Sequence, residues 1–255
     1  MIHLKLTIAY DGTGLVGWQR QAAGTSVQAL LEEALAPLEG GQVVVAGAGR
    51  TDAGVHALGQ VASVTLHRDI APRTVVRAAN MHLPPAVRVL AAEQVGPEFH
   101  ARFRATAKTY RYRIWNGNVL SPFERPFAWH VPWPMLDLAA MDSAAGRLAG
   151  THDFASFQGT GSDTETTVRT IFSSNIVGRA DETREPLITY EVRADGFLRH
   201  MVRAIVGTLV EVGRGREPES WMSEVLESRA RRRAGPTAPA MGLFLVGVEY
   251  ELGDL

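Results

Sequence analysis

The sequence of 255 residues contains no cysteine. This absence excludes disulfides, thiolate metal sites, iron–sulfur clusters and a cysteine nucleophile. Lysine is nearly absent as well, because Lys5 and Lys108 are the only lysines among 26 basic residues and the others are arginines. An arginine side chain can donate two hydrogen bonds to one phosphate and can stack on a base. Genome composition or thermal adaptation nevertheless accounts for most of these arginines without any such role.

Long apolar runs and an excess of one charge are also lacking. No stretch approaches the ~18 apolar residues of a membrane span, and the N-terminus does not have the pattern of a signal peptide. With 26 basic and 27 acidic side chains the net charge is -1, so any nucleic-acid site must be local. Because 45% of the residues are apolar and 21% charged, we expect a soluble protein without membrane contact, and the lack of cysteine fits a cytoplasmic one.

Hydrophobic periodicity predicts both strands and helices in the first half. Apolar and polar residues alternate from Ile2 to Tyr10, which is typical of a strand. Thr25 and Gln28 have capping-box spacing, so a helix is predicted to begin at Thr25 and to end near Pro37 and Gly40. The other elements predicted in this half are strands at 43–46, 60–66 and 87–90 and a helix at 74–82.

The second half begins near Ala105, where alternating tyrosines predict another strand. Apolar residues recur at helical spacing from Phe197 to Val212, which predicts a helix largely buried against a sheet. The other elements predicted here are a helix at 136–148 and strands at 170–177, 187–194 and 243–250. We therefore expect an α+β protein with two halves of similar size, residues 1–104 and 105–255.

The densest polar cluster is the glycine-rich loop GAGRTDAGVHA at residues 47–57. Its first six positions partly match a dinucleotide-binding fingerprint, but Asp52 occupies the place of the third glycine and a strand follows, which excludes that function. Two interpretations remain. Either Asp52 caps backbone N–H groups and pairs with Arg50, or the loop carries chemistry.

Six motifs in this sequence together resemble the tRNA pseudouridine synthase A family. The loop segment GRTDAGVHALGQV resembles the family signature, and the other motifs occur in the family's order: Tyr10-Asp11-Gly12 with Gly17–Gln21, Phe99–Phe103, Lys108–Tyr112, Phe197–Arg203 and Gly242-Leu243. The resemblance runs from about Leu4 to Tyr250. It implies two mixed or antiparallel ferredoxin-like halves forming one catalytic cleft, with the aspartate loop in residues 1–104 and the tyrosine strand and arginine helix in residues 105–255.

The resemblance implies an isomerase that converts uridine to pseudouridine at positions 38, 39 and 40 in the anticodon stem-loop of tRNA. It also implies a homodimer and no cofactor. Asp52 matches the family's catalytic aspartate, and breaking the N1–C1′ bond and joining C5 to C1′ needs one ionised carboxylate beside the sugar. Whether Asp52 attacks C1′ or removes a proton from C2′ stays open. A hydrolytic glycosidase would need a second carboxylate, and the loop contains none.

Two further residues are expected to be catalytic. Tyr110 matches the family's tyrosine, whose ring can stack on uracil and whose hydroxyl lies where a proton must leave C5. Arg203 matches the arginine that pairs with the catalytic aspartate and favours its ionised form. Arg199 is four residues before Arg203, so the two are predicted to share a face of the helix, and the role of Arg199 stays open.

The expected RNA contacts are made by Tyr110 and by four basic residues, Arg50, Arg102, Lys108 and Arg111. Arg50 can bind a phosphate, or it can occupy the space that a flipped-out base leaves in the RNA base stack. Alternatively, it can form an ion pair within the loop. Residues 99–130 carry six basic side chains against Glu124, and Arg229, Arg231, Arg232 and Arg233 form a second basic block. Such runs are usually solvated faces, but a local phosphate-binding surface also requires them.

Two other function classes are considered. A non-catalytic RNA-binding protein would have no use for a carboxylate that faces a phosphate-rich ligand. A metal-dependent nuclease would need several carboxylates near Asp52, and none lies beside it in the sequence. The eight histidines follow no metal-ligand spacing, so we predict no metal site.

Overall fold

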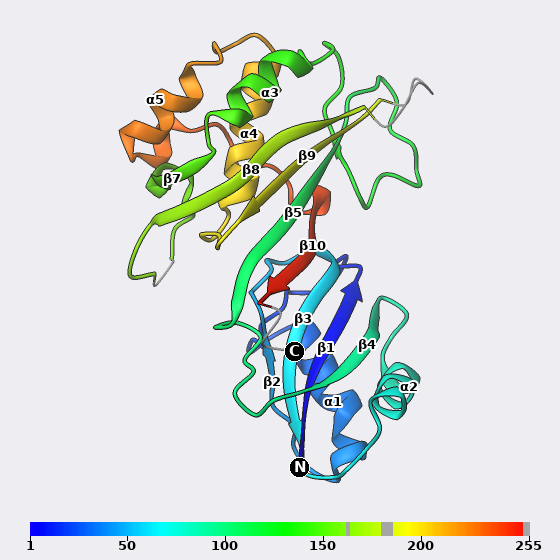
Figure 1. Cartoon of the computed structure of the whole chain (residues 1–255). Helices are drawn as coiled ribbons and strands as arrows, with labels where there is room; N and C mark the ends of the chain where they lie inside the picture. Colours follow the sequence, from blue (N-terminus) through cyan, green and yellow to red (C-terminus); the bar gives the residue numbers. More distant parts are fainter. Residues whose placement is uncertain (162–163, 180–185, 252–255) are drawn as a thin grey trace. The chain divides into compact units, whose positions relative to one another are not determined.

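The structure is a computed structural model that describes residues 1–161, 164–179 and 186–251 (Figure 1). Within these residues the chain is α+β, with ten strands in one mixed sheet and five α-helices. The chain forms two compact units. The first contains Met1–Lys108 and the last strand from Phe244 onward, and the second contains Thr109–Leu243. In this described part, no helix is long and apolar enough to cross a membrane.

The first unit is built around the N-terminal strand. Its elements are β1 (Ile2–Tyr10), α1 (Val27–Glu39), β2 (Val45–Gly47), β3 (His56–Leu66), α2 (Pro72–His82) and β4 (Val87–Val95). Strand β1 pairs antiparallel with both β3 and β4. The apolar face predicted from its alternation is buried, as are Leu31 and Leu35 of α1. Burying each such side chain contributes about 1.5–3 kcal/mol.

Element boundaries in the first unit differ from those predicted. The N-cap of α1 is Ser26 rather than Thr25, because its side chain accepts from the Ala29 backbone N–H. Gly40 ends this helix in the left-handed region at φ 79°, so the predicted end is confirmed. Strand β3 begins four residues before the predicted Gln60, directly after the aspartate loop.

The second unit surrounds one buried helix. Its elements are β5 (Ala105–Trp115), which begins in the first unit, β6 (Trp129–His130), α3 (Leu138–Gly146), β7 (Gly150–Asp153), η1 (Ala155–Phe157), β8 (Val168–Arg179), β9 (Leu187–Ala194), α4 (Met201–Gly213), α5 (Trp221–Ser228), η2 (Arg231–Arg233) and η3 (Ala240–Gly242). Helix α4 contacts α3 and α5 and is buried along almost its whole length. Gly207 allows this burial, since a Cβ there would lie 1.6 Å from the Pro236 carbonyl oxygen.

Helix α4 begins at Met201, four residues later than predicted. His200 precedes it with φ 60°, a left-handed conformation that the predicted helix did not allow for. Arg199 therefore lies outside the helix, and the prediction that Arg199 and Arg203 share a helix face is wrong. Helix α5 and the short strands β6 and β7 were not predicted.

The last strand, β10 (Leu243–Tyr250), belongs with the first unit, although the sequence placed it in the second half. Phe244 and Leu245 pair in parallel with His56 and Ala57 of β3. The ring of Phe244 also stacks on the ring of His56, with centroids 4.6 Å apart. The first unit is therefore discontinuous in sequence.

Candidate active site

The aspartate loop, defined as residues 48–55, connects β2 to β3 in the first unit. Asp52 is half-buried, and its backbone carbonyl accepts from the Val55 N–H at 3.1 Å. Gly54 is left-handed at φ 77°, and its N–H donates to the Leu15 carbonyl at 3.3 Å. These bonds form a tight turn. The backbone of this turn fixes the position from which the Asp52 side chain extends.

Buried and half-buried polar side chains support the aspartate loop. Gln60 Nε2 donates to the Gly49 carbonyl at 2.9 Å, and Lys108 Nζ donates to the Ala48 carbonyl at 2.7 Å. The Tyr10 hydroxyl is hydrogen-bonded to Thr51 Oγ1 at 2.8 Å. Burial raises the pKa of Tyr10 to about 12, so this hydroxyl stays protonated at neutral pH. Fixed polar contacts of this kind pre-organise a catalytic group.

Two glycines bring the N-terminal motifs against the same loop. A Cβ on Gly12 would lie 2.2 Å from the Val55 carbonyl oxygen, and one on Gly17 would lie 2.5 Å from that of Thr51. Gly17 also has φ 103°, which other residues rarely adopt. The Trp18 N–H donates to the Thr51 carbonyl at 3.1 Å. Gly12, Gly17 and Trp18 of the motifs at residues 10–12 and 17–21 thus pack closely against the aspartate loop.

The sequence interpretation missed the supporting roles of Tyr10, Thr51 and Gln60. Gln60 is fully buried and shares its side of β3 with Ala62 and Val64, which are also buried. The position of Gln60 in the alternation of β3 could have indicated this role. A polar side chain on the buried face of a strand needs hydrogen-bond partners there.

Among the predicted RNA contacts, Arg50 lies in the aspartate loop and Lys108 binds the backbone of that loop. Arg50 is exposed, and its Nε donates to Gln19 Oε1 at 3.1 Å. The partner that the structure gives Arg50 is therefore Gln19, whereas the sequence had suggested Asp52. Lys108 is half-buried and supports the loop directly, so its ammonium group has a structural contact whatever else it binds.

Tyr110 lies on β5 in the second unit and is only 8% exposed. Its ring meets that of Phe197 edge to face, with centroids 4.9 Å apart and an angle of 82° between the planes. Such an aromatic pair contributes about 0.5–1.5 kcal/mol beyond its buried area. Phe197, which begins the motif Phe197–Arg203, therefore fixes the orientation of the Tyr110 ring.

Arg203 is half-buried on α4 and tied to the chain that precedes η3. Its Nε donates to the Ala238 carbonyl at 2.7 Å, and the Ala238 N–H donates back to the Arg203 carbonyl at 3.0 Å. Burial raises the pKa of the Tyr112 hydroxyl, and the positive charge of Arg203 acts against that rise. The guanidinium group is thus held in place near β5.

Other arginines of the second unit serve the fold. Arg111 Nη2 pairs with Glu191 Oε2 at 2.8 Å, so an RNA phosphate would compete with this carboxylate. Arg199 Nη1 donates to the Thr160 and Gly161 carbonyls at 2.9 and 3.1 Å. Arg231 binds the Gly235 carbonyl and the Thr237 hydroxyl at 2.9 and 2.7 Å, whereas the adjacent Arg232 and Arg233 are exposed.

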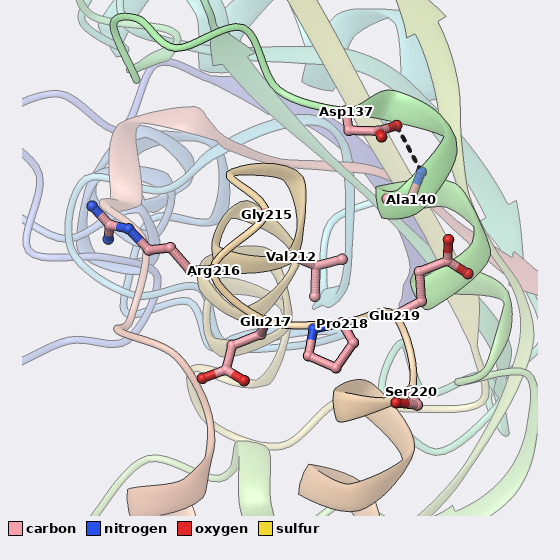
Figure 2. A pocket seen from close by; sticks show the side chains of 9 residues that line it. All are labelled: Asp137, Ala140, Val212, Gly215, Arg216, Glu217, Pro218, Glu219 and Ser220. Carbon is pink, nitrogen blue, oxygen red and sulfur yellow. Dashed lines mark hydrogen bonds between the residues drawn. The ribbon is translucent and has the colours of Figure 1, made fainter.

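A hollow of about 610 Å³ lies beside the C-terminal end of α4, and Figure 2 shows the side chains that line it. None of the predicted site residues is among them. Asp137 caps α3 by accepting from the Ala140 N–H, and Glu219 is hydrogen-bonded to Ser143. Because these carboxylates already have partners, the hollow is a poor candidate for the active site. Across residues 1–161, 164–179 and 186–251, no three histidine, aspartate or glutamate side chains gather where they could hold a metal ion.

Two stretches of the chain, residues 6–104 and 144–251, match the sequence model of a family described as tRNA pseudouridine synthase. The chain belongs to this family. The synthase is 46% identical over 253 residues to a relative from Solibacter usitatus, covering 98% of this chain and 100% of the relative. It is 48% identical over 257 residues to one from Solidesulfovibrio magneticus, covering 98% and 92%. Both relatives are named tRNA pseudouridine synthase A.

The match determines the class of this synthase, which is an isomerase acting on tRNA. Asp52 and Arg203 lie inside the matched stretches, and Lys108, Tyr110 and Arg111 lie between them. The two relatives nevertheless align along nearly the whole synthase. The resemblance inferred from six motifs is confirmed, whereas the individual residue roles stay predictions.

Proposed function

We propose that this synthase converts uridine to pseudouridine at positions 38, 39 and 40 in the anticodon stem-loop of tRNA, with Asp52 as the catalytic residue. One observation carries the residue assignment. Asp52 lies in a turn whose backbone carbonyls at Ala48, Gly49 and Thr51 are all held from behind. These bonds hold the backbone next to Asp52 in place, and fixed positioning of this kind supports a catalytic role for its carboxylate.

The reaction needs one base and one path for a proton. The N1–C1′ bond breaks, uracil rotates, C5 joins C1′, and the proton on C5 returns to nitrogen or solvent. The Asp52 carboxylate either attacks C1′ or removes a proton from C2′, and the charge of Arg203 favours its ionised form. Tyr110 stacks on the uracil and takes part in removing the C5 proton. We propose that each half has a ferredoxin-like fold and that these groups act on one uridine.

The proposed RNA contacts are Arg50, Arg102, Lys108 and Arg111, together with the Tyr110 ring. Arg50 and Arg102 are exposed, which supports phosphate binding, while Lys108 and Arg111 share their charge with the Ala48 carbonyl and the Glu191 carboxylate. The proposed mechanism uses no cofactor.

We further propose a cytoplasmic homodimer. Val119, Phe123 and Trp133 of the second unit are more than two-thirds exposed, and apolar side chains of this size favour an interface. Sedimentation of the purified protein at micromolar concentration should give the mass of two chains, and sedimentation as one chain would contradict the dimer.

Tritium release from tRNA labelled at uracil C5 tests the proposed function. We expect release without added cofactor and in the presence of a chelator, and pseudouridine mapped to positions 38–40 in the product. A non-catalytic binding protein would retain the label, and a metal-dependent nuclease would cut the RNA and stop when chelator is added. Pseudouridine formed only at other positions would contradict the assigned substrate sites.

Removing Arg203 should slow the reaction and lower the stability of the fold, and the two effects can be measured separately. In Arg203→Ala we expect turnover to fall by roughly 10²-fold, as when one pre-organised charge partner of a reacting group is lost. The buried Ala238 carbonyl also loses its donor, which costs about 1–3 kcal/mol of unfolding free energy. Single-turnover kinetics and thermal unfolding on the same sample measure the two effects.

Arg214→Ala is the matched control, because Arg214 ends the same helix and pairs with Glu211 at 3.1 Å. It should lose some stability and keep normal turnover. Equal turnover in the Arg203 and Arg214 variants would remove Arg203 from the mechanism.

A further inference from the structure

The turn between β4 and β5, residues 99–104, is fixed from inside the first unit. Phe99 is 7% exposed, and its ring lies 5.1 Å from that of Tyr250. The Tyr250 hydroxyl donates to the Ala101 carbonyl at 2.8 Å, and the Ala101 N–H donates to Ser63 Oγ at 3.3 Å. The inward residues of this turn are thus bound to β3 and β10, which limits the motion of the outward ones.

The outward residues of the same turn form an aromatic and cationic group. The Phe103 ring is 75% exposed, and the His100 ring lies beside it with centroids 4.4 Å apart. The Arg102 guanidinium carbon is 5.6 Å from the centroid of Phe103. The backbone N–H of Arg102 donates to His100 Nδ1 at 3.1 Å, and that of Arg104 donates to the His100 carbonyl at 3.1 Å. These bonds restrain the backbone of the turn that carries the three side chains.

We propose that His100, Arg102 and Phe103 form a stacking platform for an unpaired nucleotide of the bound tRNA. A base has an apolar π-face that can cover an exposed aromatic ring, and it carries a phosphate that an adjacent arginine can bind. Single exposed apolar rings are common on protein surfaces, so the proposal rests on the combination of Phe103 with the guanidinium group and the imidazole ring beside it. The inference rests on the proposed function only in taking tRNA as that ligand.

The surroundings of Phe103 favour RNA over a protein surface. Besides the platform residues, the exposed neighbours Arg104 and Thr106 are basic or polar, and Glu98 is the acidic one. The cores of protein interfaces are depleted in charge and continuous in apolar area, which a single ring among charges does not provide. A base with its phosphate matches both the ring and the cations.

Equilibrium binding of tRNA at several salt concentrations tests the stacking platform. Phe103→Ala should weaken binding by roughly 5- to 150-fold, the usual loss when a base loses its aromatic partner, without changing the slope of log affinity against log salt. Phe103→Trp keeps a π-face and should bind within about threefold of wild type. Arg102→Ala should instead lower the slope by ~0.7–0.9, because one phosphate contact is lost.

Met81→Ala is the matched control, since Met81 is an equally exposed apolar side chain in the same unit. It should bind tRNA as wild type does. Wild-type affinity in Phe103→Ala would overturn the platform, and so would a change in sedimentation that accompanies its weaker binding, because Phe103 would then belong to a protein interface. A failure of the proposed function would appear separately, as a wild-type protein that binds tRNA without forming pseudouridine.

Discussion

Asp52→Asn should fold, bind tRNA and form no detectable pseudouridine. Asparagine keeps the size of the side chain but has no charge, so neither attack on C1′ nor proton removal from C2′ remains available. We expect turnover to fall by at least about 10⁴-fold, as for other lost nucleophiles and bases. Stability should change by less than about 1 kcal/mol, because Gln60, Lys108 and the Trp18 N–H hold the loop through backbone carbonyls.

The measurement is pseudouridine formation, tRNA affinity and thermal stability on one preparation. Asp69→Asn is the control, since Asp69 is an exposed aspartate of the same unit and its loss changes net charge equally. It should be indistinguishable from wild type in all three assays. A stable Asp52→Asn protein with normal turnover would refute the mechanism, and an unfolded one would show that Asp52 is a structural cap.

The second largest effect is expected for Tyr110→Phe. The ring and its edge-to-face contact with Phe197 are kept, so RNA binding and stability should change little. Loss of the hydroxyl should slow turnover by roughly 10²- to 10⁴-fold if it takes part in proton transfer. The decisive measurement compares single-turnover rates with affinity, because a merely structural hydroxyl would alter stability instead.

Tyr190→Phe is the control for this variant. The Tyr190 hydroxyl is fully buried in the same unit and bonds to Ser174 Oγ at 2.9 Å. Its removal should cost about 1–3 kcal/mol of stability, because Ser174 loses its partner, and should leave turnover unchanged. If Tyr110→Phe turned over at the wild-type rate, the Tyr110 hydroxyl would have no catalytic role.

The parts of the fold that the sequence predicts are those in which periodicity and caps agree. Strand β1 alternates cleanly because one of its faces is buried, and α1 ends at Gly40, which adopts the left-handed conformation that such ends need. The glycine-rich segment at residues 47–57 is recognisable as well, since three glycines and Asp52 between two apolar strands are unusual. Local chemistry determines all of these features.

What the sequence does not predict depends on contacts between distant segments. The partner of β10 is β3, and nothing near Phe244 indicates a parallel pairing with His56. The start of α4 is set by the left-handed His200, which packs over Gly159, while the apolar spacing continues through it. The hydrogen bond from Lys108 to the Ala48 carbonyl likewise joins residues that are 60 positions apart.

The discontinuity of the first unit has a consequence for biosynthesis. A ribosome makes the aspartate loop early, but β10, which pairs with β3 immediately after that loop, is made last. Until then the edge of β3 at His56 has neither its parallel partner nor the ring of Phe244. Nascent chains and proteins truncated before Leu243 should therefore expose this edge to chaperones or to aggregation. The strand that follows the aspartate loop therefore gains its pairing with β10 only after residues 243–250 have been translated.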